Sequence, residues 1–310
     1  MTIDRKALLR QLDWPLWILG LVVVLSLAGF GVYYYFDRYV HPDQKILDVQ
    51  AQHMEEMVQK NPQDASLRVT LAAYYADSGL LDNAIEQANQ GLKIDPVNQG
   101  ALLVLGNVYQ KKGDLATALA NYNHFLDLNK DNPMANMDTR VEGAYYEVGN
   151  IYLEQKKLSE ATDALNKALA IDHADADALY ALGRVYQLQK NDTAAVKQFE
   201  QALAFDPTYS EPYRALVTSY TALGKTQEAA YANAMVTLTQ GKYSDAASQL
   251  EAVLKQAPQL TRAYYGLGVA YEKLGRFKDA YTAMGNYLKS YPDDVAGDEV
   301  MTLIKSEYKP

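Results

Sequence analysis

The chain has 310 residues, a formal net charge of -9 and no cysteine. The acidic balance argues against nucleic acid as the main partner, because phosphate binding needs concentrated lysine and arginine. The lack of cysteine excludes disulfide bonds and thiol chemistry. Apolar residues make up 49% of the chain, which is enough for a packed core, so disorder is not expected.

The first predicted element is a membrane-spanning helix over Trp14–Phe36, which follows a basic segment at residues 1–13. This stretch has no charged side chain, and at about 1.5 Å per residue it is about 34 Å long, enough to cross a hydrocarbon core of about 30 Å. Tryptophans at one end and tyrosines at the other match the interfacial belt of a spanning helix. A cleaved signal peptide ending at Ala28 is the alternative. Because the apolar run continues beyond Ala28 to Phe36, an uncleaved anchor is favoured.

The orientation of this helix is predicted from its flanking charges. Arg5, Lys6 and Arg10 precede it, whereas only Arg38 and Lys45 follow it closely. The excess of basic residues before the span favours a cytoplasmic N-terminus. The rest of the chain is then expected outside the cytoplasm, in a periplasm or at the cell exterior.

A pattern centred on residues 178–186 recurs along the chain. The segment Ala-Leu-Tyr-Ala-Leu-Gly-Arg-Val-Tyr is followed by Ala195, Phe199, Ala202 and Pro207. This pattern resembles the tetratricopeptide repeat (TPR), a helix-turn-helix unit of about 34 residues. Comparable units are predicted to begin at Ala65, Gln99, Glu142, Ala176, Ser210 and Thr261. The resemblance covers residues 65–294 and implies an all-α, right-handed TPR solenoid of about six helix pairs, preceded by the one transmembrane helix.

Two segments are predicted to cover the ends of the array. Residues 37–64 form a linker and an amphipathic helix over Asp43–Lys60, and residues 295–310 form a C-terminal capping tail. Stacked repeats need such caps because their outermost apolar faces have no neighbour.

Two irregularities interrupt the repeat. Nine extra residues, 132–140, separate the second and third units, and they are interpreted either as a longer loop with a lengthened helix or as a partner-contacting insert. After the unit at Ser210 the phase slips by half a repeat. A helix near Thr226–Gln240 is therefore expected to serve one unit as its second helix and the next as its first.

No catalytic motif is found in the sequence. The four histidines are scattered, and no glycine-rich phosphate loop is present. The protein is therefore predicted to be no enzyme, with no cofactor, no metal and no small-molecule substrate. The acidic run from Asp172 to Asp177 is interpreted as helix capping rather than metal binding, because it lacks the glycine and final glutamate of a calcium loop. Asn191 begins a glycosylation sequon, which matters only if the array is extracytoplasmic.

The TPR resemblance places a partner-binding groove on the first helices of the units, at repeat positions 2, 5, 9 and 12. The candidate groove residues are Asn107, Tyr146, Asn150, Tyr180, Arg184, Arg214 and Tyr265. Asparagine can hydrogen-bond a peptide backbone through its donor and its acceptor, and arginine can hold a carboxylate. The alternative is an ordinary polar groove. A chaperone C-terminus is not predicted as the ligand, because position 5 carries no lysine.

The predicted function is a membrane-anchored protein-interaction scaffold, or accessory assembly subunit, of a cell-envelope complex. Its partners are a protein or peptide segment and the membrane itself. A holdase-like chaperone for translocated chains and a structural subunit of a larger membrane complex are the alternatives.

Overall fold

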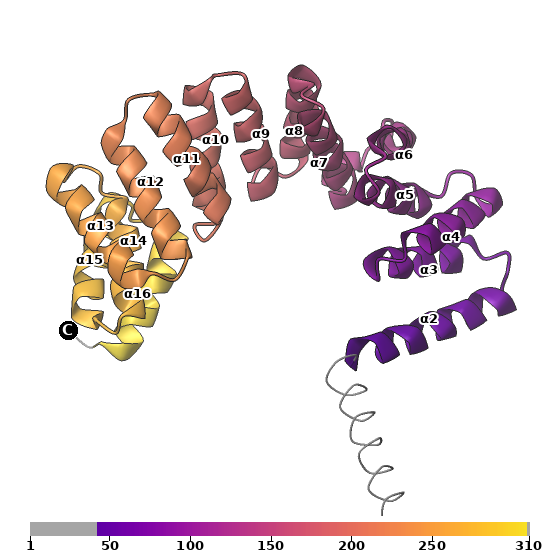
Figure 1. The fold of residues 1–310 in the computed structure, drawn as a ribbon, viewed down its shortest axis with the longest axis horizontal. Coiled ribbons are helices and arrows are strands. Elements are labelled where there is room, and N and C mark those ends of the chain that lie inside the picture. The colour runs from indigo at the N-terminus through magenta and orange to yellow at the C-terminus, as the bar shows by residue number, and fades with distance from the viewer. Residues whose placement is uncertain (1–41, 309–310) are drawn as a thin grey trace, which may run out of the picture. The chain divides into compact units, whose positions relative to one another are not determined.

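The structure, a computed structural model, describes residues 42–308, and every regular element in that range is a helix (Figure 1). The first four α-helices are α2 (Pro42–Lys60), α3 (Ala65–Asp77), α4 (Leu81–Ile94) and α5 (Gln99–Lys111). They are followed by α6 (Leu115–Asn129), the 3₁₀ helix η2 (Ala135–Met137), α7 (Thr139–Glu154), α8 (Leu158–Ile171), α9 (Ala176–Leu188), α10 (Asp192–Phe205) and α11 (Ser210–Ala222). The last five are α12 (Thr226–Thr239), α13 (Tyr243–Gln256), α14 (Ala263–Lys273), α15 (Phe277–Ser290) and α16 (Val295–Glu307).

The described chain divides into two compact units, with the boundary inside α5 between Val108 and Tyr109. The first unit packs α2 against α3 and α3 against α4, and its core includes Val58, Leu71 and Tyr75. In the second unit each helix from α7 to α16 packs against the next along the chain. The predicted all-helical repeat architecture is confirmed over these residues.

The predicted repeat boundaries agree closely with the helices. Helices α3, α5, α9 and α11 begin at the predicted residues, whereas α7 begins three residues before Glu142 and α14 two residues after Thr261. Aspartate caps explain several starts: Asp64 accepts a hydrogen bond from the Leu67 amide, and Asp175 accepts from the amides of Asp177 and Ala178. Such caps satisfy amides that have no partner within the helix.

The turn inside each helix pair needs one residue in the left-handed region. Gly79 and Gly113 occupy it with φ of 76° and 79°, as glycine does without steric cost. Lys156 and Lys190 hold the equivalent place in the next two units, with φ of 58° and 61°. The turn geometry is therefore kept where the sequence lacks glycine.

Glycines inside the first helices allow close approach of the second helices. Gly149 lies against Leu165, Gly183 against Phe199 and Gly268 against Met284, always sixteen positions apart. A Cβ atom at Gly183 would come within 2.4 Å of Phe199 Cε1, far closer than atoms tolerate. In these three units the glycine thus makes room for the large residue of the unit's own second helix.

Helix α12 occupies the half-repeat slip. It packs against both α11 and α13 and also contacts α14. It buries Tyr231, Ala232, Ala234, Met235 and Leu238. These buried residues face more than one side of the helix, as its shared position between two successive pairs requires. The prediction that this helix serves two units is consistent with that packing.

Helices flank the array at both ends. Proline is well suited to the first turn of a helix, and α2 begins at Pro42 before it packs on α3, where the hydroxyl of Tyr75 donates to Glu55 across 2.5 Å. At the other end α16 packs on α15 and buries Met301 and Ile304.

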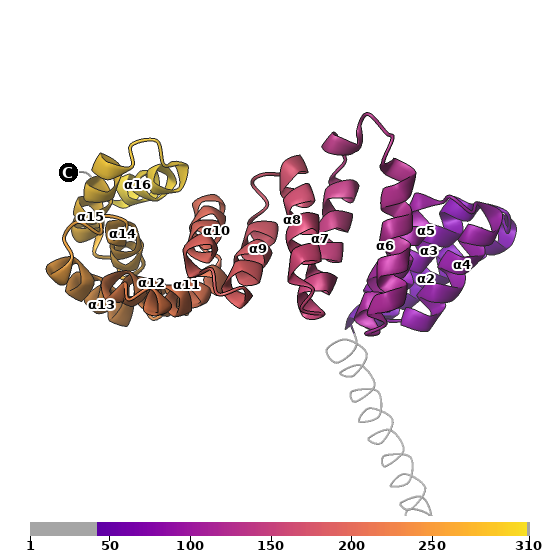
Figure 2. The same ribbon diagram turned by 90° about the horizontal axis from the view of Figure 1, so that it is seen from above.

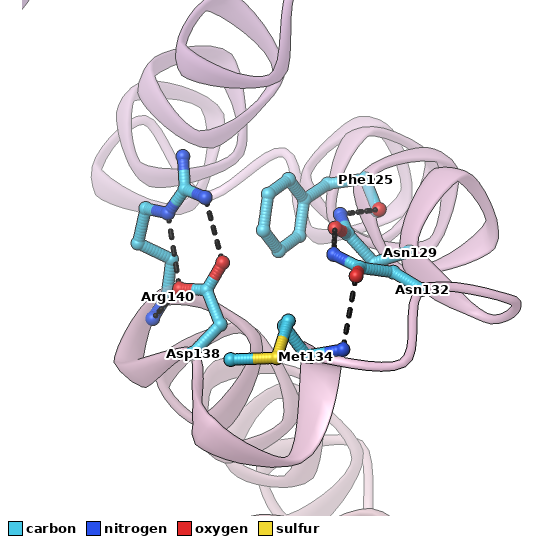
Figure 3. A network of polar contacts seen from close by, with 6 residues as sticks. All are labelled: Phe125, Asn129, Asn132, Met134, Asp138 and Arg140. Carbon is cyan, nitrogen blue, oxygen red and sulfur yellow. Dashed lines mark hydrogen bonds and ion pairs between the residues drawn. The ribbon is translucent and has the colours of Figure 1, made fainter.

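The nine-residue insertion forms a short, hydrogen-bonded turn (Figure 3). Asn132 accepts from the Met134 amide at 3.0 Å, and the guanidinium of Arg140 donates to both carboxylate oxygens of Asp138 at 3.0 and 2.6 Å. The segment contains η2, and α7 is 16 residues long where α9 has 13. This geometry matches a longer loop joined to a lengthened helix. Met134 and Met137 are exposed on it.

The predicted transmembrane helix over Trp14–Phe36 lies outside the described residues. Among the helices of residues 42–308, none is both long and apolar enough to cross a bilayer.

Candidate partner-binding site

Two predicted groove residues lie one helical turn apart on α7. Tyr146 and Asn150 are both half-buried, and their side chains are hydrogen-bonded to each other. Burial raises the pKa of Tyr146, and the nearby carboxylates of Asp177 and Asp175 contribute to the rise. The contact with the tyrosine covers part of Asn150.

The next two predicted groove residues lie at the equivalent places on α9. The guanidinium of Arg184 stands 5.9 Å from the centre of the Tyr180 ring, within the range of a cation–π contact. Arg184 itself is exposed, whereas Tyr180 is half-buried and packs against Phe199 at 5.8 Å between ring centres. Arg184 is thus oriented by an aromatic surface while its charge faces solvent.

Tyr209 joins these two pairs and was missed in the sequence. Its ring lies 5.4 Å from that of Tyr180, and its hydroxyl is hydrogen-bonded to Asp177. Burial makes the largest contribution to raising the pKa of Tyr209, and the hydrogen bond to Asp177 raises it further. Electrostatic interactions with Tyr146 and Tyr180 also raise this pKa. The sequence feature that could have identified Tyr209 is its position. It is the N-cap residue of α11, whereas the N-cap residues of α3 and α9 are aspartates.

Together these six side chains, Tyr146, Asn150, Asp177, Tyr180, Arg184 and Tyr209, are called here the aromatic cluster. They come from α7, α9 and the start of α11, and helix α7 contacts α9 as α9 contacts α11. The cluster offers flat rings, an amide and one exposed guanidinium. Such a set suits an extended protein segment, because tyrosine gives contact area at low entropic cost and arginine and asparagine supply directed hydrogen bonds.

The other predicted groove residues are not part of this cluster. Asn107 is half-buried on α5 in the first unit, and Arg214 is exposed on α11, where no described contact joins it to the cluster. Tyr265, on α14, lines a separate pocket in the C-terminal half of the second unit. Of the seven candidates, Tyr146, Asn150, Tyr180 and Arg184 belong to the aromatic cluster.

The aspartates between α8 and α9 form hydrogen bonds with nearby groups of the chain. Asp175 caps α9, and Asp172 accepts a hydrogen bond from the Ala174 amide. Glu142 of α7 is hydrogen-bonded to Asp175, and burial, that bond and the charges of both aspartates raise the pKa of Glu142 to about 7. Over residues 42–308, no group of three or more acidic or histidine side chains is placed to hold a metal ion.

Comparison with protein families matches repeat models to four stretches of the chain. A TPR repeat model matches residues 149–190, and three tetratricopeptide repeat models match residues 100–132, 176–209 and 231–295. The chain contains tetratricopeptide repeats. The last match begins inside α12, which supports the assignment of that helix as the first of a new TPR pair.

Individual known proteins resemble parts of this chain. The BBSome complex member BBS4 of Bos taurus is 32% identical over 76 residues, which are 24% of this chain and only 15% of that protein. The crystal structure of MamA is 26% identical and covers 56% of this chain and 96% of its own, with a TM-score of 0.50. A double mutant of MamA RS-1 is 19% identical, with a TM-score of 0.52 over 57% of this chain and 95% of its own. These likenesses support the repeat fold.

Proposed function

We propose that this TPR protein is a membrane-anchored scaffold or accessory assembly subunit of a cell-envelope complex, and that it binds a protein segment through the aromatic cluster. The observation that carries the proposal is the placement of Arg184 against Tyr180, beside Tyr209 and the Tyr146–Asn150 pair. Arginine and tyrosine are enriched among the hot spots of protein interfaces. The bovine relative, a complex member, fits the same general role over its short match.

The anchor and the orientation are part of the proposal. The uncharged stretch Trp14–Phe36 would hold the chain in the membrane, and the basic residues before it would keep the N-terminus in the cytoplasm. The TPR array would then lie in a periplasm or at the cell exterior. Protease added to intact spheroplasts should digest the array, and protection until lysis would reverse the orientation.

The test of the binding site is partner capture by the full chain in mild detergent. The double change Asn150→Ala with Arg184→Ala should weaken capture about fivefold or more, since one hot-spot side chain contributes about 1 kcal/mol or more. Its effect on melting should be small, because both side chains reach solvent. The matched control is Asn233→Ala with Lys197→Ala, which removes an exposed amide and an exposed cation elsewhere in the second unit.

The captured material also distinguishes the alternative functions. One stoichiometric partner supports the scaffold or a structural subunit, and dependence of its capture on Arg184 and Asn150 favours the scaffold. Many substoichiometric clients would instead indicate a holdase-like chaperone. Unchanged capture by the double variant, with unchanged melting, would refute the aromatic cluster as the docking site.

A further inference from the structure

A second recess lies in the C-terminal half of the second unit. This pocket has a volume of about 220 Å³ and is lined by the five tyrosines Tyr213, Tyr231, Tyr265, Tyr287 and Tyr291, together with three charged side chains. It is called here the tyrosine pocket. The aromatic cluster shares none of these residues, and the proposed function leaves the pocket unused.

The curved arrangement of successive helices creates the pocket. Figure 2 shows the helices from α10 to α16 bending round, so that α16 returns toward α10. Leu203 of α10 and Ala296 of α16 accordingly line the same recess, although 93 positions separate them in the sequence. Its tyrosines come from α11, α12, α14 and the end of α15.

Stacked rings form one wall of the pocket. The ring of Tyr287 lies 5.3 Å from that of Tyr265 and 4.8 Å from that of Tyr291, measured between centres. Tyr287 is buried, Tyr265 is half-buried and Tyr291 is exposed. The accessible part of this wall is therefore made by Tyr265 and Tyr291. Ring faces carry negative electrostatic potential and attract cations.

The charges at the pocket leave an excess of negative charge. Arg262 is the one cation among the described lining residues, and its guanidinium forms an ion pair with Glu200, also in the lining. The third charged residue of the lining is Asp294, which lies outside that ion pair. It accepts a hydrogen bond from the Gly297 amide at 2.6 Å, and Tyr287 is also hydrogen-bonded to it.

Two more carboxylates contribute to the negative potential at the accessible wall. Asp206 and Glu299 act with Asp294 on Tyr265, whose pKa burial and these charges raise to about 12. The negative potential at Tyr265 therefore has three sources on three different segments of the chain. An anionic ligand would be repelled there, and a purely apolar ligand would leave the carboxylates and hydroxyls without partners.

We propose that the tyrosine pocket binds a lysine or arginine side chain carried on an extended segment of a partner protein. The aliphatic part of such a side chain would lie against Tyr265 and Tyr291, and its charged end would face Asp294. This inference rests on the proposed function, because it takes the ligand to be a segment of a partner protein. It adds a second contact point and names the chemistry recognised there.

The test uses the full chain in mild detergent and fluorescein-labelled glycine–serine peptides of twelve residues with a central Lys-Gly-Lys, measured by fluorescence anisotropy. Matched peptides carry arginine, norleucine or glutamate in place of both lysines. Lysine and arginine peptides should bind about tenfold more tightly than norleucine peptides, and glutamate peptides should bind least. Raising the salt concentration from about 50 to 500 mM should weaken only the cationic peptides, because salt screens exposed charges.

Two variants locate the binding in the pocket. Asp294→Asn removes a charge but can still cap α16, and Tyr291→Leu removes an exposed ring, and each should weaken lysine-peptide binding about threefold to tenfold. Asp114→Asn makes the same change at the cap of α6, so it should leave binding unchanged. Equal binding of norleucine and lysine peptides, or wild-type binding by both pocket variants, would overturn the proposal.

The Asn150→Ala with Arg184→Ala variant separates this inference from the proposed function. It should bind the lysine peptide as the wild type does, because the aromatic cluster shares no residue with the pocket. Loss of partner capture in that variant, with no peptide binding by any form of the chain, would refute the pocket and leave the proposed function standing. The reverse pattern would refute the cluster and support the pocket.

Discussion

The hydroxyl of Tyr220, on α11, donates to the carboxylate of Glu200, on α10, twenty residues earlier. The same carboxylate receives the guanidinium of Arg262, which precedes α14, and Arg262 Nη1 also lies 3.4 Å from the Tyr220 hydroxyl oxygen. A tyrosine–glutamate bond with the same spacing joins Tyr271 to Glu251. One carboxylate thus connects three segments of the second unit.

Removing Arg262 should destabilise this junction. Burial alone would lower the pKa of Arg262, but the charge and hydrogen bond of Glu200 outweigh burial and raise it. Arg262→Met should lower the free energy of unfolding by about 1 kcal/mol, since the pair is still partly screened by solvent. Urea denaturation followed by circular dichroism measures the change.

The comparison for that variant is Arg276→Met. Arg276 forms an exposed ion pair with Asp279 and lies over the Tyr271 ring at 4.1 Å. Its removal should change stability less than removal of Arg262. An equal or larger loss at position 276 would contradict the structural importance assigned to the Glu200 junction.

The glycine on α9 should tolerate no side chain. Gly183→Ala places a methyl group against the Phe199 ring, and overpacking of this kind costs about 1–3 kcal/mol. Gly143→Ala, on α7, meets no atom within 4 Å and should stabilise the helix by about 0.5–1 kcal/mol, because alanine is the better helix former. Thermal melting should therefore move in opposite directions for the two variants.

The stability should depend on pH through Glu142. Its folded-state pKa is raised from 4.5 to about 7 by burial and by Asp175, so the native state retains a proton that the unfolded state releases. The contribution of Glu142 to the stability of the protein should therefore be greatest below about pH 4.5 and should fall as the pH rises toward 7. After allowance for partial solvent exposure the loss is about 1 kcal/mol.

Glu142→Gln should remove that part of the pH profile and be the more stable form at pH 8. Denaturation curves between pH 4 and 8 measure the difference between variant and wild type. Glu160→Gln changes an exposed carboxylate in the first turn of α8 and serves as the control. A constant difference between wild type and Glu142→Gln across the whole range would contradict the assignment.

The C-terminal helix should act as a cap through one face. Ile304 is fully buried in α16, whereas its neighbour Leu303 is 47% exposed. Ile304→Ala should destabilise the protein by about 2–4 kcal/mol, because it removes buried methyl groups and leaves a cavity. Leu303→Ala should change stability by less than about 0.5 kcal/mol. Similar melting of the two variants would mean that α16 does not pack as described.

The helix pairs and their order could be predicted from the amino-acid sequence. These features depend on local signals: apolar residues at helical spacing, an aspartate such as Asp64 before a helix, and Gly79 or Gly113 at a turn. The half-repeat slip was visible for the same reason, because helix α12 lacks the pattern of a first helix yet leads into a normal turn at Gly241. Such signals act within one or two turns of chain, so they can be read without the fold.

The aromatic cluster and the tyrosine pocket were only partly predictable. Tyr146, Asn150, Tyr180 and Arg184 followed from repeat positions, but Tyr209 joins them from a cap position that the repeat pattern does not mark. Glu200 meets Arg262 across 62 residues only because small rotations between successive helices accumulate into a curve. Those rotations are set by side-chain packing between neighbouring helices, so only the tertiary structure decided which distant tyrosines and charges would share a site.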